Sequence, residues 1–333
     1  MASQTAPARA EEAASFGRWL MGRGLLPIIL VVTFVGFGLV EPNVFRPENL
    51  LNILIQASYP AVFATAQMFT LLTRGFDLSL GVTVSMVSVV GGLVMAALAP
   101  SMPIPLALAI GALAGLVSGA LVGVVNGTCV SVLRVNPFVV TLGTWNIVLG
   151  IATTASGGKQ IFDIPAELNT WFYRDAWLGV PPPIVLAILL LIVAHLVMAH
   201  TVLGRGLYII GGNPRAAHVA GMPSRLFTTL AYVLCSLYAA AGALMLTART
   251  GSGEPNMGGN LTLESIAAAV VGGVSLRGGE GTILSPILGA LFVTVLSNGM
   301  NLLRIDGYIQ QMILGAVIIA AIFLDRIRRQ QRS

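Results

Sequence analysis

Residues 103–126 read PIPLALAIGALAGLVSGALVGVVN, a run without a single charged side chain. A helix of about 20 apolar residues crosses the hydrocarbon core of a bilayer, so this run predicts a membrane-spanning helix. Glycine recurs at every fourth position from residue 111, which places these glycines on one face of the helix. Because glycine has no side chain, this stripe predicts close packing against the backbone of another helix. The stripe consists of Gly111, Gly115, Gly119, Gly123 and Gly127.

The composition extends this interpretation to the whole chain. Of the 333 residues, 56% are hydrophobic and 9% are charged, whereas a soluble domain carries roughly 25% charged residues. Most of the chain must therefore face lipid or other membrane segments. Cys129 and Cys235 lie in apolar runs and indicate neither a disulfide framework nor a metal motif. The basic residues are scattered between apolar segments, so we expect no nucleic-acid partner. The cysteine spacing predicts no metal site.

Apolar runs divide the chain into about ten transmembrane helices, which predicts an all-α polytopic membrane protein. The membrane domain covers residues 24–325, between an N-terminal segment, 1–23, and a basic tail, 326–333. The eighth run is short and rich in glycine, so we expect it to be broken or only partly inserted. The ten candidate spans are 24–41, 50–72, 78–98, 103–126, 137–155, 182–199, 226–247, 262–276, 282–303 and 308–324.

The distribution of positive charge predicts the orientation. If the N-terminus is cytoplasmic and the spans alternate, most of the 18 Lys and Arg residues fall on the cytoplasmic side. Cytoplasmic loops are enriched in these residues, so we expect both termini in the cytoplasm. Residues 156–181 then form the longest periplasmic loop, and 200–225 form a cytoplasmic loop. Proline near the start and glycine at the end of 213–221 predict a short helix there.

A weak repeat links two of the spans. GALVGVVNGTCVSVLRV (119–135) and GALFVTVLSNGMNLLRI (289–305) share their first three residues, an Asn-Gly pair and an arginine near the end. In the predicted topology the two segments cross the membrane in opposite directions, as inverted repeats of transporters do. Chance similarity between apolar sequences is the alternative.

The stretch LTRGFDLSLG (72–81) places two charges between long apolar runs. One interpretation is a tight cytoplasmic turn, in which Gly75 permits the turn, Arg74 is an anchor and Asp77 caps the next helix. The other is a functional ion pair below the membrane surface, because charges inside membranes are usually functional.

The sequence lacks the residues that would bind nucleotide. Its one lysine, Lys159, is followed by Gln160, so the P-loop pattern is absent. Among His195, His200 and His218, none has a carboxylate or a cysteine at metal-ligand spacing. No nucleophile–base pair appears either. We therefore expect a non-enzymatic chain that binds no cofactor, with any ATP and Mg²⁺ held by a partner.

Uncharged polar residues lie inside the predicted spans. Amides and hydroxyls offer both donors and acceptors, which suits a neutral polyhydroxylated solute. Hydrogen bonding between helices is the alternative for each of them. The candidates for a substrate pathway are Gln67, Asn126, Thr141, Thr144, Asn146, Asn298 and Asn301.

Several stretches together resemble the permease subunit of ribose/monosaccharide-type ABC importers, a family that includes branched-chain amino acid and autoinducer-2 permeases. They are LTRGFDLSLG, VNPFVVTLGT (135–144), GRGLYIIGGNPRAAHVAGM (204–222) and residues 272–303, and they recur in family order over about 50–325. Arg74 departs from the family pattern, in which we expect a small residue, typically glycine.

The resemblance implies an importer of the bacterial inner membrane. It has two permease subunits, identical or different, two cytoplasmic ATPase domains and a periplasmic sugar-binding protein that docks on the periplasmic loop. The GGNPRAAHVAGM loop would couple the permease to the ATPase. The coupling residues are Arg205, Gly212, Asn213, Arg215, Ala217, His218 and Gly221.

Two other classes stay open. An ion-coupled secondary carrier for a neutral solute would be expected to keep a carboxylate deep in the bundle, and no carboxylate falls in the middle of a predicted span. A membrane scaffold or channel-like subunit would work without an ATPase.

Overall fold

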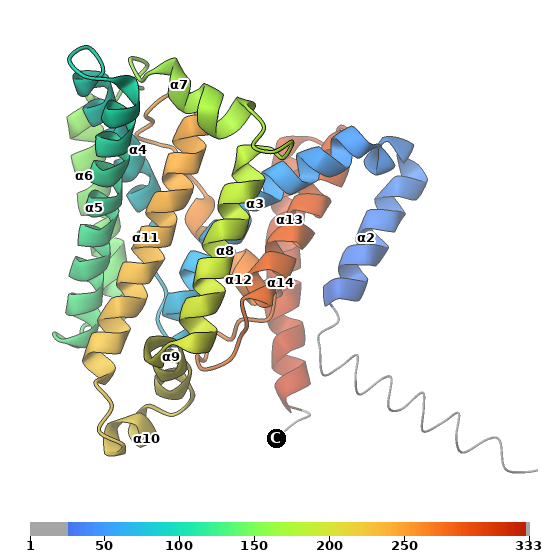
Figure 1. The fold of residues 1–333 in the computed structure, drawn as a ribbon. Coiled ribbons are helices and arrows are strands. Elements are labelled where there is room, and N and C mark those ends of the chain that lie inside the picture. Colours follow the sequence, from blue (N-terminus) through green and yellow to red (C-terminus); the bar gives the residue numbers. More distant parts are fainter. Residues whose placement is uncertain (1–25, 331–333) are drawn as a thin grey trace, which may run out of the picture.

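The computed structural model describes residues 26–330 as a bundle of helices with loops at its two ends (Figure 1). Within these residues the chain forms no β-strand. Its helices are α2 (Leu26–Val40), η1 (Pro42–Phe45), α3 (Pro47–Leu72), α4 (Leu80–Leu98), α5 (Ile104–Ser131), α6 (Pro137–Ser156), α7 (Ala166–Asn169), η2 (Thr170–Arg174), α8 (Pro182–His200), α9 (Val202–Gly212), α10 (Pro214–Val219), α11 (Ser224–Thr250), α12 (Leu261–Val271), α13 (Leu284–Leu302) and α14 (Gly307–Gln330).

Each of the ten predicted spans overlaps one of these helices. In the described part of the chain, six of them (α4, α5, α6, α8, α11 and α13) are long and apolar enough to cross a membrane. Helix α12 has 11 residues, and at 1.5 Å per residue it is too short to cross alone. The sequence predicted a broken element there. The ten crossings, the inverted repeat and the orientation of the termini stay predictions, and segments 1–23 and 331–333 lie outside the described residues.

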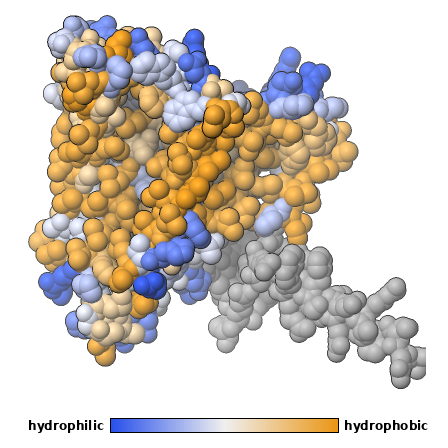
Figure 2. All heavy atoms as spheres, in the orientation of Figure 1, coloured by the Kyte–Doolittle hydropathy of each residue, from blue (hydrophilic) through white to orange (hydrophobic). Residues whose placement is uncertain are grey.

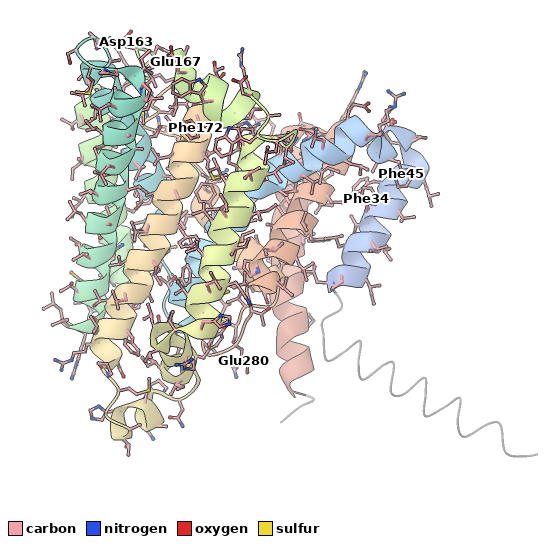
Figure 3. The ribbon with its side chains drawn as sticks, in the orientation of Figure 1. Phe34, Phe45, Asp163, Glu167, Phe172 and Glu280 are labelled. Atoms are coloured by element: carbon pink, nitrogen blue, oxygen red, sulfur yellow. The ribbon has the colours of Figure 1, made fainter. Side chains whose placement is uncertain are left out.

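On the face shown in Figure 2, apolar side chains form a broad belt across the middle of the bundle, with hydrophilic residues gathered toward both ends. We call these ends the α7 end, which carries α7 and η2, and the α10 end, which carries α9 and α10 (Figure 1). Asp163 and Glu167 lie at the α7 end and Glu280 at the α10 end (Figure 3). The belt is what a surface in contact with lipid requires, and the predicted topology places the α10 end in the cytoplasm.

Helix α3 forms the centre of the bundle. It packs against α8, α11, α12 and α13, and almost all of its residues from Ala57 to Leu72 are buried. Thr65, Gln67 and Thr70 are among them. Because neighbouring helices surround this part of α3, its polar side chains can meet protein partners instead of lipid.

The glycine stripe lies where α5 packs against α4 and α11, and all five glycines are buried. A Cβ atom on Gly119 would lie 2.7 Å from the Cβ of Ala240, and one on Gly123 would lie 2.7 Å from the carbonyl oxygen of Tyr232. A backbone oxygen cannot move aside as a flexible side chain can. The absence of a side chain is therefore what lets α5 approach α11 this closely.

Three helices end at an arginine in the left-handed conformation. Arg74 follows α3 with φ 66°, Arg134 follows α5 with φ 59°, and Arg304 follows α13 with φ 57°. Helices often end this way, but usually with glycine. In the turn after α3 the left-handed residue is therefore Arg74, and Gly75 does not have a positive φ. Gly75 is required instead by the hydroxyl of Tyr232, which a Cβ atom would meet.

Candidate functional site

A buried polar network connects the turn between α3 and α4 to α5. The Oδ1 atom of Asp77 accepts hydrogen bonds from the backbone N–H of Ser79 at 2.8 Å and from its hydroxyl at 2.6 Å. The Nδ2 atom of Asn126 donates to the Ser79 hydroxyl at 2.8 Å, and to the two carboxylate oxygens at 3.3 and 3.4 Å. All three residues are completely buried.

Gln67 of α3 and Thr144 of α6 complete this network. The Nε2 atom of Gln67 donates to the carbonyl oxygen of Asp77 at 2.6 Å, and its Oε1 atom accepts from the N–H of Asp77 at 3.2 Å. The hydroxyl of Thr144 donates to Oδ1 of Asn126 at 2.6 Å. Buried polar groups are stable when their hydrogen bonds are made, so the network ties four elements together. We call Gln67, Asp77, Ser79, Asn126 and Thr144 the polar network.

The two charges of LTRGFDLSLG point in different directions. Asp77 accepts a backbone N–H just before α4, as a capping residue would, but the N-cap of α4 is Ser79. The turn does not expose Asp77 to water, because the surrounding helices cover it completely. Arg74 is exposed and donates to the end of α9, away from the network. Arg74 and Asp77 each bond to other groups, so they do not form the ion pair of the second interpretation.

Two predicted pathway residues on α6 do not join the network through their own hydrogen bonds. Thr141 is buried, but its hydroxyl donates to the carbonyl oxygen of Pro137 in the same helix at 2.8 Å. Asn146 is exposed and donates to the carbonyl oxygen of Leu142 at 3.1 Å. Their predicted role in a pathway stays a prediction.

The two asparagines of α13 bond to neighbouring helices. Asn298 and Asn49 of α3 exchange amide hydrogen bonds of 3.1 and 2.9 Å. Asn301 accepts from Nε2 of Gln310 in α14 at 2.8 Å. These contacts match the alternative of helix–helix bonding, while any contact with a substrate stays a prediction.

An irregular segment, residues 251–260, runs from α11 to α12 beside α4. The N–H of Glu254 donates to the hydroxyl of Ser88 at 3.1 Å, and the N–H of Gly258 donates to the hydroxyl of Ser85 at 2.9 Å. The first turn of α12 lies next to the start of α4, because Thr262 accepts from the N–H of Gly81 at 2.9 Å. Non-helical backbone beside a membrane-spanning helix is tolerated where protein buries it or where it lines a passage.

Our sequence interpretation missed Ser79, Ser85, Ser88 and Thr262. The signal was a series of hydroxyl side chains through an otherwise apolar span, at positions 79, 83, 85 and 88. On a helix that faces only lipid, such hydroxyl groups would find no hydrogen-bond partner outside their own helix. Their partners in 251–260 lie far away in the sequence, so only the fold brings them together.

The short helix predicted over 213–221 is confirmed as α10. The side chain of Asn213 accepts from the N–H of Ala216 at 3.0 Å at its start, and Gly221 ends it with φ 69°. Among the predicted coupling residues, Ala217 is completely buried, and its role in coupling stays a prediction. A helix this short must turn one face to the protein body. The exposed coupling residues are Arg205, Gly212, Asn213, Arg215, His218 and Gly221.

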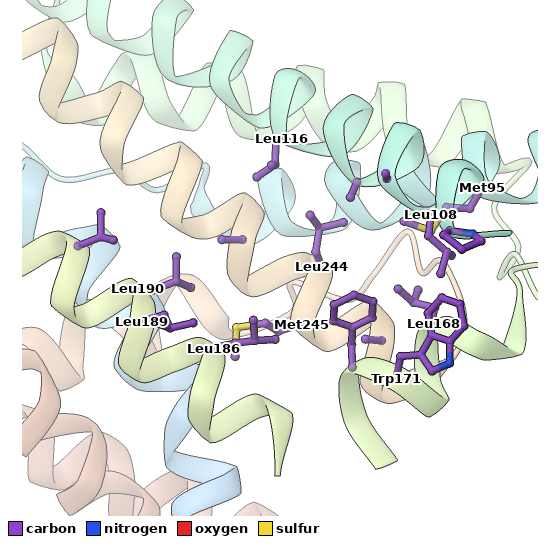
Figure 4. A pocket seen from close by; sticks show the side chains of 17 residues that line it. Met95, Leu108, Leu116, Leu168, Trp171, Leu186, Leu189, Leu190, Leu244 and Met245 are labelled. Carbon is purple, nitrogen blue, oxygen red and sulfur yellow. The ribbon is translucent and has the colours of Figure 1, made fainter. Parts of the chain in front are cut away.

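An apolar cavity of about 450 Å³ opens between α5, α8 and α11 (Figure 4). Leu116, Leu190 and Leu244 line one part, and Leu168 and Trp171 lie at its α7 end. The lining offers almost no hydrogen-bonding groups. The cavity is therefore unsuited to a polyhydroxylated solute, and the candidate site remains the polar network with residues 251–260.

A helical membrane bundle with an internal polar network, irregular backbone along a spanning helix and an exposed short helix at one end has the features of a membrane transport protein.

The chain belongs to the family described as branched-chain amino acid transport system / permease component, whose model matches residues 49–322. It is 33% identical to the ribose import permease protein RbsC of Escherichia coli (strain K12), over 92% of this chain and 94% of that protein. It is 31% identical to the D-allose transport system permease protein AlsC of the same strain, over 90% of each chain. Identity to the L-arabinose transport system permease protein AraH of that strain is 32%, over 96% of this chain and 94% of that one. No solved structure matches the chain significantly.

Family membership and the six apolar helices identify a multi-pass protein of the inner membrane.

Proposed function

We propose that this chain forms the pathway for a monosaccharide, or a similar neutral polyhydroxylated solute, through the inner membrane in an ABC importer. The observation that carries the proposal is the nearly full-length similarity to permeases named for ribose, allose and arabinose. The structure adds neutral amide and hydroxyl groups inside an apolar bundle. Such groups exchange hydrogen bonds with sugar hydroxyls without requiring a charge on the solute.

The energy comes from a separate ATPase subunit, which holds ATP and Mg²⁺ and sits against α10. A periplasmic binding protein delivers the solute, and a second permease subunit, identical or different, completes the passage. Supporting this assignment, α10 exposes Arg215, His218 and Val219 on a short, capped helix. A rigid exposed helix transmits a push better than a flexible loop does.

Uptake measurements test the proposed function. The full chain is reconstituted in proteoliposomes with its copurified ATPase and binding protein, and labelled ribose, allose, arabinose and leucine are offered in turn. We expect uptake of at least one sugar that requires ATP, and no uptake of leucine. An ATPase whose P-loop lysine is replaced serves as the control and should abolish uptake.

One observation favours the alternative function, an ion-coupled secondary carrier, so the experiment also tests it. Asp77 is a buried carboxylate of the kind that ion-coupled carriers use. Sugar uptake by this chain alone, driven by a proton or sodium gradient without ATP, would replace the importer proposal with the carrier.

The seat of the ATPase on α10 has its own test. Replacing Arg215 and His218 together by alanine removes two exposed side chains and leaves the cap of α10 intact. We expect less ATPase to copurify with this variant. Lys159→Ala, an exposed change in the loop after α6, is the matched control and should not alter copurification. If the wild type, the double variant and Lys159→Ala all recover the same amount of ATPase, the proposal that the ATPase sits on α10 is contradicted.

A further inference from the structure

We propose that Arg74 is a positioning residue that links α10 to the polar network, so that movement of the α10 end reaches the interior of the bundle. The inference rests on the proposed function, because it assigns the route by which an ATPase on α10 acts on the pathway.

The side chain of Arg74 holds the end of α9. Its Nε atom donates to the carbonyl oxygen of Gly211 at 2.6 Å, and its Nη2 atom donates to that of Gly212 at 2.9 Å. Carbonyl groups at a helix C-terminus carry partial negative charge, so both hydrogen bonds are charge-assisted. The next residue, Asn213, caps α10. A shift of α10 therefore pulls directly on the Arg74 guanidinium.

The backbone of Arg74 belongs to the turn that carries Asp77. The N–H of Gly75 donates to the carbonyl oxygen of Thr70 at 3.0 Å, which fixes the turn on the end of α3. Gly75 is buried against Tyr232, and Asp77 lies in the polar network. Closely packed interiors transmit displacement because there is no free space to absorb it. A pull on Arg74 is thus carried to Asp77 and from there to α5 and α6.

A third segment, residues 275–281, lies beside the stem of the same side chain. The N–H of Gly279 donates to the carbonyl oxygen of Leu72 at 2.9 Å, and the hydroxyl of Tyr208 in α9 donates to that of Gly281 at 2.9 Å. A Cβ atom on Gly278 would lie 2.6 Å from Cγ of Arg74. The stem of Arg74 therefore lies against this segment, while its guanidinium bonds to the end of α9.

The left-handed backbone at Arg74 allows a variant that removes the link and keeps the turn. Glycine adopts φ 66° without strain, so Arg74→Gly deletes the guanidinium and does not disturb the end of α3. Arg74→Lys keeps the charge but loses the two-pronged geometry. Arg134, with φ 59° at the end of α5, supplies the matched control Arg134→Gly.

Transport stoichiometry is the first test. In the proteoliposomes described above, we measure sugar imported per ATP hydrolysed, using the sugar that the wild type takes up. We expect Arg74→Gly to lower this ratio about fivefold while ATP hydrolysis continues. A change of this size lies within the range by which single residues alter the coupling between two sites. Arg74→Lys should fall between, and Arg134→Gly should match the wild type. An unchanged ratio in Arg74→Gly overturns the inference and leaves the proposed function standing.

Hydrogen exchange in the chain alone, in lipid nanodiscs, is the second test. Asn213→Ala removes the side-chain cap of α10, and the amide exchange of residues 76–79 reports whether the change arrives at the network. We expect Asn213→Ala to speed this exchange when Arg74 is present and to leave it unchanged in the Arg74→Gly background. An equal effect in both backgrounds overturns the inference. This test needs no partner, so it decides the link even if the wild type shows no ATP-dependent uptake, which would end the proposed function instead.

Discussion

Asp77 places a carboxylate where the surrounding helices exclude water. An isolated carboxylate in such surroundings would be unstable by many kcal/mol, and hydrogen-bond donors around it offset this penalty. Ser79 supplies a backbone N–H and a hydroxyl, and Asn126 supplies its amide. Because these donors come from two elements, the same contacts that stabilise the carboxylate also fix the position of α5 relative to the α3–α4 turn.

Removing this carboxylate should destabilise the protein. Asp77→Ala leaves the backbone N–H and the hydroxyl of Ser79 without their acceptor, at about 1–3 kcal/mol for each buried group. We expect a clearly lower thermal unfolding midpoint in detergent, and a smaller decrease for Asp77→Asn, which keeps an acceptor oxygen. Asp163→Ala at the exposed α7 end (Figure 3) should unfold like the wild type. If Asp77→Ala also does so, the network does not stabilise the bundle.

Helix α5 packs against its neighbours through the glycine stripe, a face that carries no side chains. Its stripe contacts α4 in one half and α11 in the other, through Val87 next to Gly115 and Thr229 next to Gly127. In a membrane, helices gain little from burying apolar surface, so the close backbone contact itself supplies the attraction. The stripe therefore makes α4, α5 and α11 one rigid group.

Alanine scanning of glycines tests this rigid group. Gly123→Ala places a methyl group against the backbone of Tyr232 and Val233, each 2.7 Å away, and overpacking of this kind costs about 1–3 kcal/mol. Gly143 of α6 has no neighbouring atom within 4 Å of its Cβ position. We expect Gly123→Ala to lower the unfolding midpoint and Gly143→Ala to leave it unchanged or raise it. A harmless Gly123→Ala would mean that α5 and α11 separate easily.

The spacing of glycines in the sequence was enough to predict that α5 has a packing face, since periodicity alone determines which residues share a face. It was not enough to identify α4 and α11 as partners. Similarly, Gln67, Asn126 and Thr144 were recognisable as polar residues within spans, but Asn146 looked equivalent to them and is exposed. Which side of a helix faces protein depends on tertiary packing, and an apolar surface facing lipid resembles one facing other helices.

For the molecule as a whole, the distribution of positive charge predicts which end is cytoplasmic, and labelling tests this. Val219 of α10 is 87% exposed, and Leu178 near the α7 end is fully exposed, whereas the buried Ala217 would not react. Val219 and Leu178 are replaced by cysteine, one at a time, in a chain in which Cys129 and Cys235 are changed to serine. A membrane-impermeant maleimide on spheroplasts should label Leu178→Cys at once and Val219→Cys only after permeabilisation. The reverse pattern would invert the topology and remove α10 from the cytoplasm.

The bundle is mechanically uneven. On one side of α11 the glycine stripe leaves no free volume, while on the other the cavity of about 450 Å³ separates α8 from α5. Helix α8 continues into α9 after only Thr201. Tilting α8 toward α5 therefore closes free volume, whereas a comparable motion of α5 disrupts the close contacts of the glycine stripe. We therefore expect α8, which leads through α9 to α10, to move more easily than α4, α5 and α11, which the glycine stripe holds together.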